Sequence, residues 1–567
     1  MLAEKIDEKI VLAGDPRDRT KIKSIPGARF GAKTKQWTIP LTWTHCLILR
    51  AVFGEALEIG PELHYWGMRE QLSNRHTLLS RDTAMGVNTK KVPGRHDFYA
   101  HQNSAVDFLD LADNVILADE MGTGKTATVI EAIDGAGQYP ALIVAPKSVV
   151  GTWVAEYAKW APHVRVQPVV GGAQKRRKAL EVEADVYVVG WGSVRLHSRL
   201  AGYGSTKLKD GEKEEKELNR PWAVVVADEA HRMKDPKAKQ TRALWAIGDG
   251  AERRIAMTGT PIANHPGDFW SLLRFIEPAA WPSKVKYVDL FCETAWNAWG
   301  AVDVTGLKPS MKSTFFEAVD LHFLRRQKDV ILKDLPEKVY MTRVVELTPK
   351  QRKAYRELKE EMVAELDSED LVVTDQLVVL GRLVALASSM LDSNEEDGVF
   401  PVEPSNKLDA LEEILTDIGD EPAVVFATSR KLIDLTEERL ERHKIICTRV
   451  TGAESDEQRW RNIEDFQAGR ARVILCTVGA GGEGITLTKS RNVIFLQRPW
   501  SLVQSLQAED RIHRPGAEVH DFLRVIDIVS EGTIDEDVVD KLVVKGERLE
   551  ELTRDKETLE RILNATF

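Results

Sequence analysis

The sequence contains few cysteines and no long apolar run. Its four cysteines stand far apart in 567 residues, which excludes a disulfide framework and zinc knuckles of the CxxC type. No segment approaches the roughly 18 consecutive apolar residues of a membrane span, and the first residues lack the apolar core of a secretory signal. We therefore expect a soluble protein with no membrane partner, located in the cytoplasm of a bacterial cell or a phage-infected host.

The net charge of −10 excludes a surface that is basic throughout. The segment from Arg17 to Arg50 is different, because it holds eight lysines and arginines and one aspartate. This local excess makes the N-terminal segment the place where we expect a polyanion to bind.

Short β-branched runs, each followed by a polar loop and a helical pattern, occur in two sets. The first set is Val115–Ala118, Ala141–Val144, Val186–Val189, Ala223–Val226 and Arg254–Met257, and the second is Ala423–Phe426, Val473–Leu475, Asn492–Leu496 and Phe522–Ile526. Such alternation is typical of α/β folds with parallel sheets. We predict a small N-terminal α+β module (1–90), a first RecA-like lobe (91–280), a mostly helical insert (281–400), a second RecA-like lobe (401–545) and a C-terminal helix (546–567).

A phosphate-binding loop is predicted after the first of these strands. The order is strand, Asp119-Glu120-Met121-Gly122-Thr123-Gly124-Lys125-Thr126, and then a helix. Glycines let backbone N–H groups close on phosphate oxygens, Lys125 can reach the terminal phosphates, and Thr126 can bind Mg²⁺. The strict pattern has glycine where Asp119 stands, so a simple glycine turn is the alternative.

An acidic pair follows the strand Ala223–Val226. Asp228 can bind Mg²⁺ and Glu229 can orient and deprotonate a water that attacks ATP. The alternative is a pair of acids that caps the next helix. His231 belongs to the same Asp-Glu-Ala-His segment, where a structural role is the alternative.

Two arginines of the second lobe complete the expected site. Arg511 and Arg514 are three residues apart, so on a helix they share a face. Guanidinium groups placed in this way can stabilise charge on the transferring phosphoryl group.

Two tryptophans, Trp153 and Trp160, have the spacing of one helical face and are predicted to pack in the core.

Together these motifs resemble those of superfamily 2 helicase-like motors of the switch/sucrose-non-fermenting (Snf-type) group. The resemblance covers residues 94–545 and includes the non-glycine at Asp119. Its motifs are Ile116–Thr126, Thr258-Gly259-Thr260-Pro261, Leu324–Val330 with Leu335–Lys338, Val424–Thr428, Thr477–Ile485 and Gln507–Arg514.

The resemblance implies ATP and Mg²⁺ as cofactors and duplex or forked DNA, bound without sequence preference, as partner. It implies that Gln102 reads adenine, that Gly482 and Glu483 lie near the nucleotide, and that Thr258, Gly259 and Thr260 couple nucleotide state to movement. Lys147, Ser148, Thr477 and Gly481 are implied to contact the nucleic-acid backbone.

We therefore expect a DNA-stimulated ATPase that tracks along DNA in replication, repair or fork remodelling. The alternatives are a DNA or RNA helicase that separates strands, a motor subunit of a larger assembly, and an ATP-gated DNA clamp that does not hydrolyse ATP. Lys125, Asp228, Glu229 and Arg514 together argue against the clamp.

The N-terminal segment resembles the DNA-binding module of annealing helicases. The similar stretches are Ile25–Phe30 and Lys35–Pro40. Arg29 and Lys35 can bind phosphates and Trp37 can stack on a base. The alternative is a small β-rich cap in which Trp37 belongs to the core.

Overall fold

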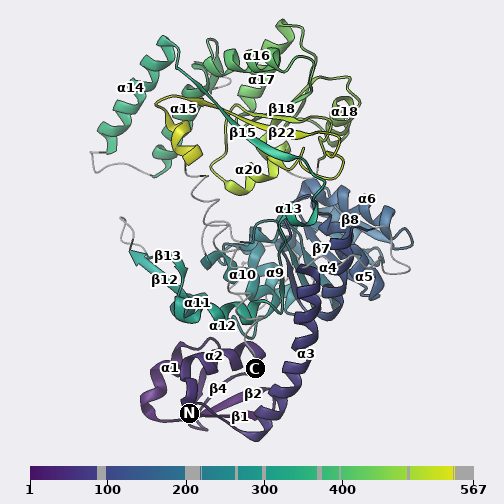
Figure 1. Cartoon of the computed structure of the whole chain (residues 1–567), viewed down its shortest axis with the longest axis vertical. Helices are drawn as coiled ribbons and strands as arrows, with labels where there is room; N and C mark the ends of the chain where they lie inside the picture. Colours follow the sequence, from purple (N-terminus) through teal and green to yellow (C-terminus); the bar gives the residue numbers. More distant parts are fainter. Residues whose placement is uncertain are drawn as a thin grey trace. The chain divides into compact units, whose positions relative to one another are not determined.

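The structure is a computed structural model in which two compact units are described separately (Figure 1). It describes residues 1–85, 98–197, 218, 220–261, 266–296, 302–366, 373–394, 398–481, 485–540 and 542. The first unit runs from Met1 to Ile331, and the second begins at Leu332. Within these ranges, no helix has both the length and the apolar character that crossing a membrane requires. The predicted helix 546–567 lies outside the described residues.

The first unit starts with the small module that the sequence predicts. Its strands are β1 (Leu2–Ile6), β2 (Lys9–Ala13), β3 (Arg29–Gly31), β4 (Gln36–Pro40) and β5 (Glu58–Ile59), in the order β3-β4-β2-β1-β5. The module also contains helices α1 (Arg19–Ser24) and α2 (Trp43–Phe53). Thr42 caps α2 by accepting a hydrogen bond from His45 N. Ile10, Ile39 and Ile48 are fully buried. Helix α3 (Pro61–Met85) then leads to the first lobe.

The first lobe is built on a parallel sheet with the order β14-β6-β11-β10-β7-β9-β8. Its strands are β6 (Val115–Leu117), β7 (Ala141–Ala145), β8 (Val166–Val169), β9 (Val186–Gly190), β10 (Trp222–Ala227), β11 (Ala251–Met257) and β14 (Phe323–Leu324). Its helices are α4 (Ala100–Leu111), α5 (Lys125–Gly135), α6 (Val150–Trp160), α7 (Ala173–Glu181), α8 (Trp191–His197), α9 (Lys239–Gly248) and α10 (Pro266–Ile276). Parallel strands are covered on both faces, which explains their continuous apolar runs.

In the segment 281–400 helices hold more residues than strands, as the sequence led us to expect, but the segment does not form a single insert. In the first unit it gives α11 (Lys284–Phe291), the hairpin β12 (Cys292–Trp296) and β13 (Val302–Leu307), α12 (Pro309–Val319), β14 and α13 (Lys328–Ile331). In the second unit it gives β15 (Glu337–Val345), α14 (Pro349–Leu366), α15 (Val373–Ser388) and the hairpin β16 (Met390–Asn394) and β17 (Gly398–Val402). Strands β14 and β15 belong to the two large sheets, so the segment divides between the lobes.

The second lobe has a parallel sheet with the order β15-β22-β21-β18-β20-β19. Its remaining strands are β18 (Ala423–Ala427), β19 (Cys447–Val450), β20 (Val473–Thr477), β21 (Asn492–Phe495) and β22 (Phe522–Ser530). Its further helices are α16 (Asn406–Asp417), α17 (Arg430–Arg442), α18 (Asp456–Gln467), α19 (Val478–Gly481) and α20 (Leu502–Glu509). The predicted fold class of two RecA-like lobes with a small N-terminal α+β module is thus confirmed.

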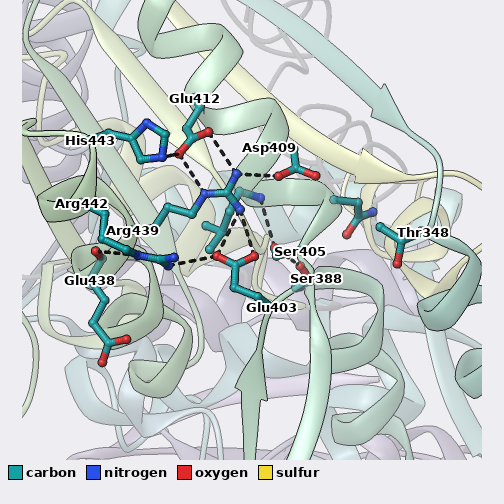
Figure 2. A network of polar contacts seen from close by, with 12 residues as sticks. Thr348, Ser388, Glu403, Ser405, Asp409, Glu412, Glu438, Arg439, Arg442 and His443 are labelled. Atoms are coloured by element: carbon teal, nitrogen blue, oxygen red, sulfur yellow. Dashed lines mark hydrogen bonds and ion pairs between the residues drawn. The ribbon is translucent and has the colours of Figure 1, made fainter.

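Arg439 connects helices α16 and α17 of the second lobe through ion pairs. Arg439 of α17 binds Glu403 after β17 and Asp409 and Glu412 of α16, with N–O distances of 2.9, 2.6 and 2.8 Å (Figure 2). Its side chain is 14% exposed, so solvent screens these ion pairs less than it screens surface pairs. The three carboxylates raise the pKa of Arg439.

Candidate functional site

The glycine-rich loop after β6 has the conformation of a phosphate-binding loop. Gly122 and Gly124 have φ angles of 77° and 80°, in the left-handed region that favours glycine. Helix α5 begins directly afterwards at Lys125, and the free N–H groups of a helix start favour an anion. Lys125 Nζ donates to the carbonyls of Asp119 and Glu120, at 2.7 and 2.9 Å. The lysine charge and the helix start therefore meet at this loop.

Helix α4 and the residue before it support this loop. Gln102 Nε2 donates to Gly124 O at 3.2 Å, and Gln102 Oε1 accepts from Tyr99 N at 3.0 Å. A Cβ atom at Gly124 would lie 2.3 Å from Gln102 Nε2, so a side chain there would displace this amide. His101 Nε2 lies 2.8 Å from Thr123 O. The adenine contact of Gln102 stays a prediction, and its amide already connects α4 to the loop.

The acidic pair lies in the loop after β10. Asp228 Oδ1 accepts from Glu229 N at 2.9 Å, and Glu229 has a left-handed φ of 50°. Desolvation and the neighbouring Glu229 carboxylate raise the pKa of Asp228 to about 6, although hydrogen bonds and Lys125 oppose the shift. Two adjacent carboxylates in a partly desolvated site are stabilised by a cation.

These donors fit magnesium in chemical type. Carboxylate and hydroxyl oxygens are the ligands that Mg²⁺ prefers, and Asp228 and the half-buried Thr126 offer one of each. Thr126 lies in the first turn of α5, next to Lys125. Asp228 and Thr126 would hold the ion, which would neutralise charge on the phosphate oxygens.

The acidic pair is connected to the loop after β11 by a histidine. His231 Nδ1 lies 3.2 Å from Glu229 Oε2 and 3.3 Å from Thr258 Oγ1, and Thr260 N donates to Thr258 Oγ1 at 3.1 Å. His231 therefore bridges Glu229 to the two threonines that the sequence predicts as coupling residues.

The same loop also touches the phosphate loop. A Cβ atom at Gly259 would lie 2.5 Å from Met121 Cγ, so a side chain there would have to displace Met121. Arg325 Nη1 donates to Gly259 O at 3.0 Å and to Ala118 O at 3.2 Å. Sequence reasoning placed Arg325 in a family motif and did not give it this role.

Sequence reasoning also missed two indoles that contact the acidic pair. Trp153 Nε1 donates to Asp228 Oδ2 at 2.9 Å, and Trp191 Nε1 donates to Asp228 O at 2.8 Å. The prediction that Trp153 packs in the core is correct, because the residue is fully buried among apolar side chains. The apolar spacing did not reveal the hydrogen bond to Asp228, because an indole can pack in the core and donate a hydrogen bond at the same time.

The two arginines of the second unit do not lie on a helix, and that expectation is wrong. Helix α20 ends at Glu509, and Arg511 and Arg514 lie in the turns that follow. Their Nη1 atoms still converge on Ile485 O, at 3.3 and 3.1 Å, and Arg514 Nη1 also donates to Thr486 Oγ1 at 2.9 Å. Burial and the neighbouring charge of Arg511 lower the pKa of Arg514.

The remaining predicted residues are placed as follows. Lys147 and Ser148 are exposed in the turn between β7 and α6, Thr477 is half-buried at the end of β20, and Gly481 ends α19. Gly482 and Glu483 lie outside the described residues.

In the N-terminal module the predicted residues differ in exposure. Arg29 and Lys35 are exposed, whereas Trp37 is half-buried, packs on the core and lies 5.2 Å from the ring of Phe30. Phe30 is the more accessible ring, with 51% exposure.

Comparisons with known proteins agree with the motifs. Residues 76–389 match the family model described as SNF2-related domain, and residues 406–516 match the helicase conserved C-terminal domain. The chain is 28% identical to the uncharacterized ATP-dependent helicase MG018 of Mycoplasma genitalium and 26% identical to the ISWI chromatin-remodeling complex ATPase ISW1 of Saccharomyces cerevisiae. These alignments cover 75% and 76% of this chain and 38% of each relative, so the chain spans well under half of their length.

A solved structure is also similar to the chain. The SWI2/SNF2 ATPase core of Sulfolobus solfataricus in complex with dsDNA is 24% identical, with 82% of this chain and 94% of that chain covered and a TM-score of 0.38.

Proposed function

The chain belongs to the SNF2-related family of helicase-like ATPases, and we propose from this premise that it is an ATP-dependent translocase that tracks along duplex or forked DNA. Its SNF2-related and helicase C-terminal domains are those of an ATPase. Replication, repair or fork remodelling is the setting that we propose for this activity.

One observation carries the ATPase part of this proposal. Lys125 lies at the phosphate loop after β6. The acidic pair follows β10, which β11 separates from β6 in the same sheet, and His231 connects Glu229 to Thr258. In the proposed reaction Lys125 binds the terminal phosphates and Glu229 accepts the proton of the attacking water. We assign to Arg514 the stabilisation of charge on the transferring group. The movement of Thr258 and Thr260 with the nucleotide would then drive translocation.

The DNA part of the proposal rests on the exposed turn at Lys147 and Ser148 and on the ends of β20 and α19. We assign backbone contacts to Lys147, Ser148, Thr477 and Gly481, since phosphate contacts allow tracking without sequence preference. Arg29 and Lys35 of the N-terminal module supply further positive charge.

The experiment that tests the function is steady-state ATP hydrolysis with five additions: none, single-stranded DNA, duplex DNA, forked DNA and RNA. We expect strong stimulation by duplex or forked DNA, abolished by Lys125→Ala. Lys353→Ala is the matched control, because this lysine is exposed in the second unit. Stimulation by single strands or RNA alone would indicate a strand-separating helicase, and DNA binding without turnover would indicate a clamp.

Translocation needs its own assay. Displacement of a third strand from a triplex reports movement along duplex DNA without separation of its strands. Failure to displace the third strand, with DNA-stimulated hydrolysis intact, would contradict the translocase and leave a DNA-dependent ATPase.

A further inference from the structure

Asp228 is held by hydrogen bonds to both its backbone and its carboxylate. Its backbone N–H donates to Val144 O at 2.8 Å, and its backbone carbonyl accepts from the indole of Trp191. Its carboxylate accepts from Glu229 N through Oδ1 and from Trp153 Nε1 through Oδ2. The indole of Trp153 is the side-chain donor on Oδ2 in the described part of the chain.

Trp153 is connected to the exposed turn at Lys147 and Ser148 through the start of helix α6. This turn (Lys147–Val149) runs directly into α6, and Trp153 lies in the first turn of that helix. The side chain is fully buried, and its ring lies 6.3 Å from that of Tyr157 on the same helix. A helix with a packed face moves as one body, because close-packed interiors transmit displacements rather than absorb them. Any shift at the turn therefore reaches the indole.

Trp191 lies beside the same turn. It follows Gly190, the last residue of β9, and a Cβ atom at Gly190 would lie 3.8 Å from Lys147 Cα. Both indoles that contact Asp228 are thus positioned by elements that border the Lys147 turn. Of the two, Trp153 contacts the carboxylate and Trp191 contacts the main chain.

From this geometry we propose that Trp153 is a positioning residue that relays DNA binding at Lys147 and Ser148 to the Asp228 carboxylate through its indole hydrogen bond. The inference rests on the proposed function and adds the route by which DNA stimulates ATP hydrolysis. Binding of a DNA phosphate at the turn would fix the start of α6, and the indole would then hold Asp228 Oδ2 in the orientation that the magnesium–nucleotide complex needs.

The decisive variant replaces Trp153 with 3-benzothienylalanine, in which sulfur takes the place of the indole N–H. This replacement keeps the ring volume in the core and removes only the donor. Trp153→Phe is the genetically simpler variant, and circular dichroism and thermal unfolding check that both variants fold. Tyr157→Phe is the matched control, because Tyr157 Oη is buried on the same helix with no hydrogen-bond partner among the described residues.

Two quantities are measured for each protein. The first is the stimulation factor, the turnover with saturating duplex DNA divided by the turnover without DNA. The second is the ratio of DNA dissociation constants with and without Mg²⁺ and a non-hydrolysable ATP analogue, which reports coupling without catalysis because linkage is reciprocal. A hydrogen bond to a charged group shifts an equilibrium by about tenfold or more.

We expect both ratios to move toward 1 by about tenfold in the two Trp153 variants and to stay at wild-type values in Tyr157→Phe. A benzothienyl variant with wild-type ratios would overturn the relay and leave the proposed function intact. Equal loss in Tyr157→Phe would also overturn it, since general loosening of α6 would then explain the effect. If DNA did not stimulate ATP hydrolysis by the wild-type protein, both the relay and the translocase would be overturned.

Discussion

Arg326 and Asp119 form an ion pair in the interior of the first lobe, where each exposes 3% of its surface. Asp119 Oδ1 accepts from Arg326 N at 3.0 Å and from Arg326 Nε at 3.1 Å. Arg326 also donates to Ala84 O and His101 O, at 3.1 and 2.8 Å. The aspartate that replaces the usual glycine of a phosphate loop therefore fastens the loop to the segment after β14.

We expect Asp119→Ala to lower the free energy of unfolding of the first unit by about 3–5 kcal/mol, because it leaves the Arg326 charge buried without its partner. Urea unfolding, followed by tryptophan fluorescence, measures this loss. The double variant Asp119→Ala/Arg326→Met should recover part of it, since an apolar pair avoids the uncompensated charge.

Glu183→Ala is the control for this cycle. Glu183 is 90% exposed and lies 3.7 Å from Arg165, so its removal should change stability by less than about 0.5 kcal/mol. If Asp119→Ala were equally mild, the buried pair would not hold the loop.

The sequence predicted the central strands well because buried parallel strands are continuous apolar runs, as in β7 and β10. It missed β15, whose residues are mostly exposed, and β14, which has two residues. At the candidate site, local motifs indicated Lys125, Asp228 and Glu229, whose catalytic roles stay predictions. The partner of Asp119 lies 207 residues away, and no local spacing reveals such a contact.

The two arginines after α20 should differ in effect. Arg511 is 5% exposed and donates to the main-chain carbonyls of Gln507 and Ile485, whereas Arg514 is less buried and also contacts the Thr486 hydroxyl. We expect Arg514→Ala to lower kcat by about 10²–10³ with nucleotide affinity retained. Arg511→Ala should lower both kcat and the stability of the second unit.

Steady-state hydrolysis, nucleotide binding and urea unfolding separate these two outcomes. Arg470→Ala is the control, because this arginine is 56% exposed and pairs with Asp465 on the surface. Wild-type kcat in Arg514→Ala would remove Arg514 from the proposed chemistry.

The N-terminal module should lose stability as the pH falls from about 6.5 to about 4. Burial lowers the pKa of His45 to about 4, and its ring nitrogens lie 2.8 Å from Thr42 Oγ1 and from Pro26 O. Between these pH values His45 binds a proton in the unfolded chain but not in the folded module. The free energy of unfolding therefore decreases as the pH decreases. Above 6.5 the effect is absent, and the full loss below 4 is roughly 3 kcal/mol.

Urea unfolding at several pH values, compared between the wild type and His45→Gln, isolates this contribution because other titrating groups are common to both proteins. The wild type should show the steeper decline between pH 6.5 and 4. Parallel curves would mean that His45 becomes charged inside the folded module.

Phe30 and Trp37 of the same module offer a test that separates DNA contact from folding. Their rings are neighbours, but Phe30 is half exposed and Trp37 packs on the core. We expect Phe30→Ala to weaken binding of forked DNA by about tenfold, as loss of one stacked base would, with unfolding unchanged. Trp37→Ala should lower the stability of the module, and intact stability in this variant would return Trp37 to the role of a stacking residue.

The positive charge on the hairpin of β3 and β4 should strengthen DNA binding by contacting phosphates. Lys35 has a left-handed φ of 56° in the turn between β3 and β4, and both Lys35 and Arg29 are exposed. We expect Lys35→Gly to reduce the slope of log K against log[salt] by about 0.7–0.9, the value for one released counterion. Glycine accepts the left-handed conformation, so the turn is retained. Fluorescence anisotropy with labelled forked DNA at several KCl concentrations measures the slope, and an unchanged slope, as we expect for Lys353→Ala, would place the DNA contact outside this turn.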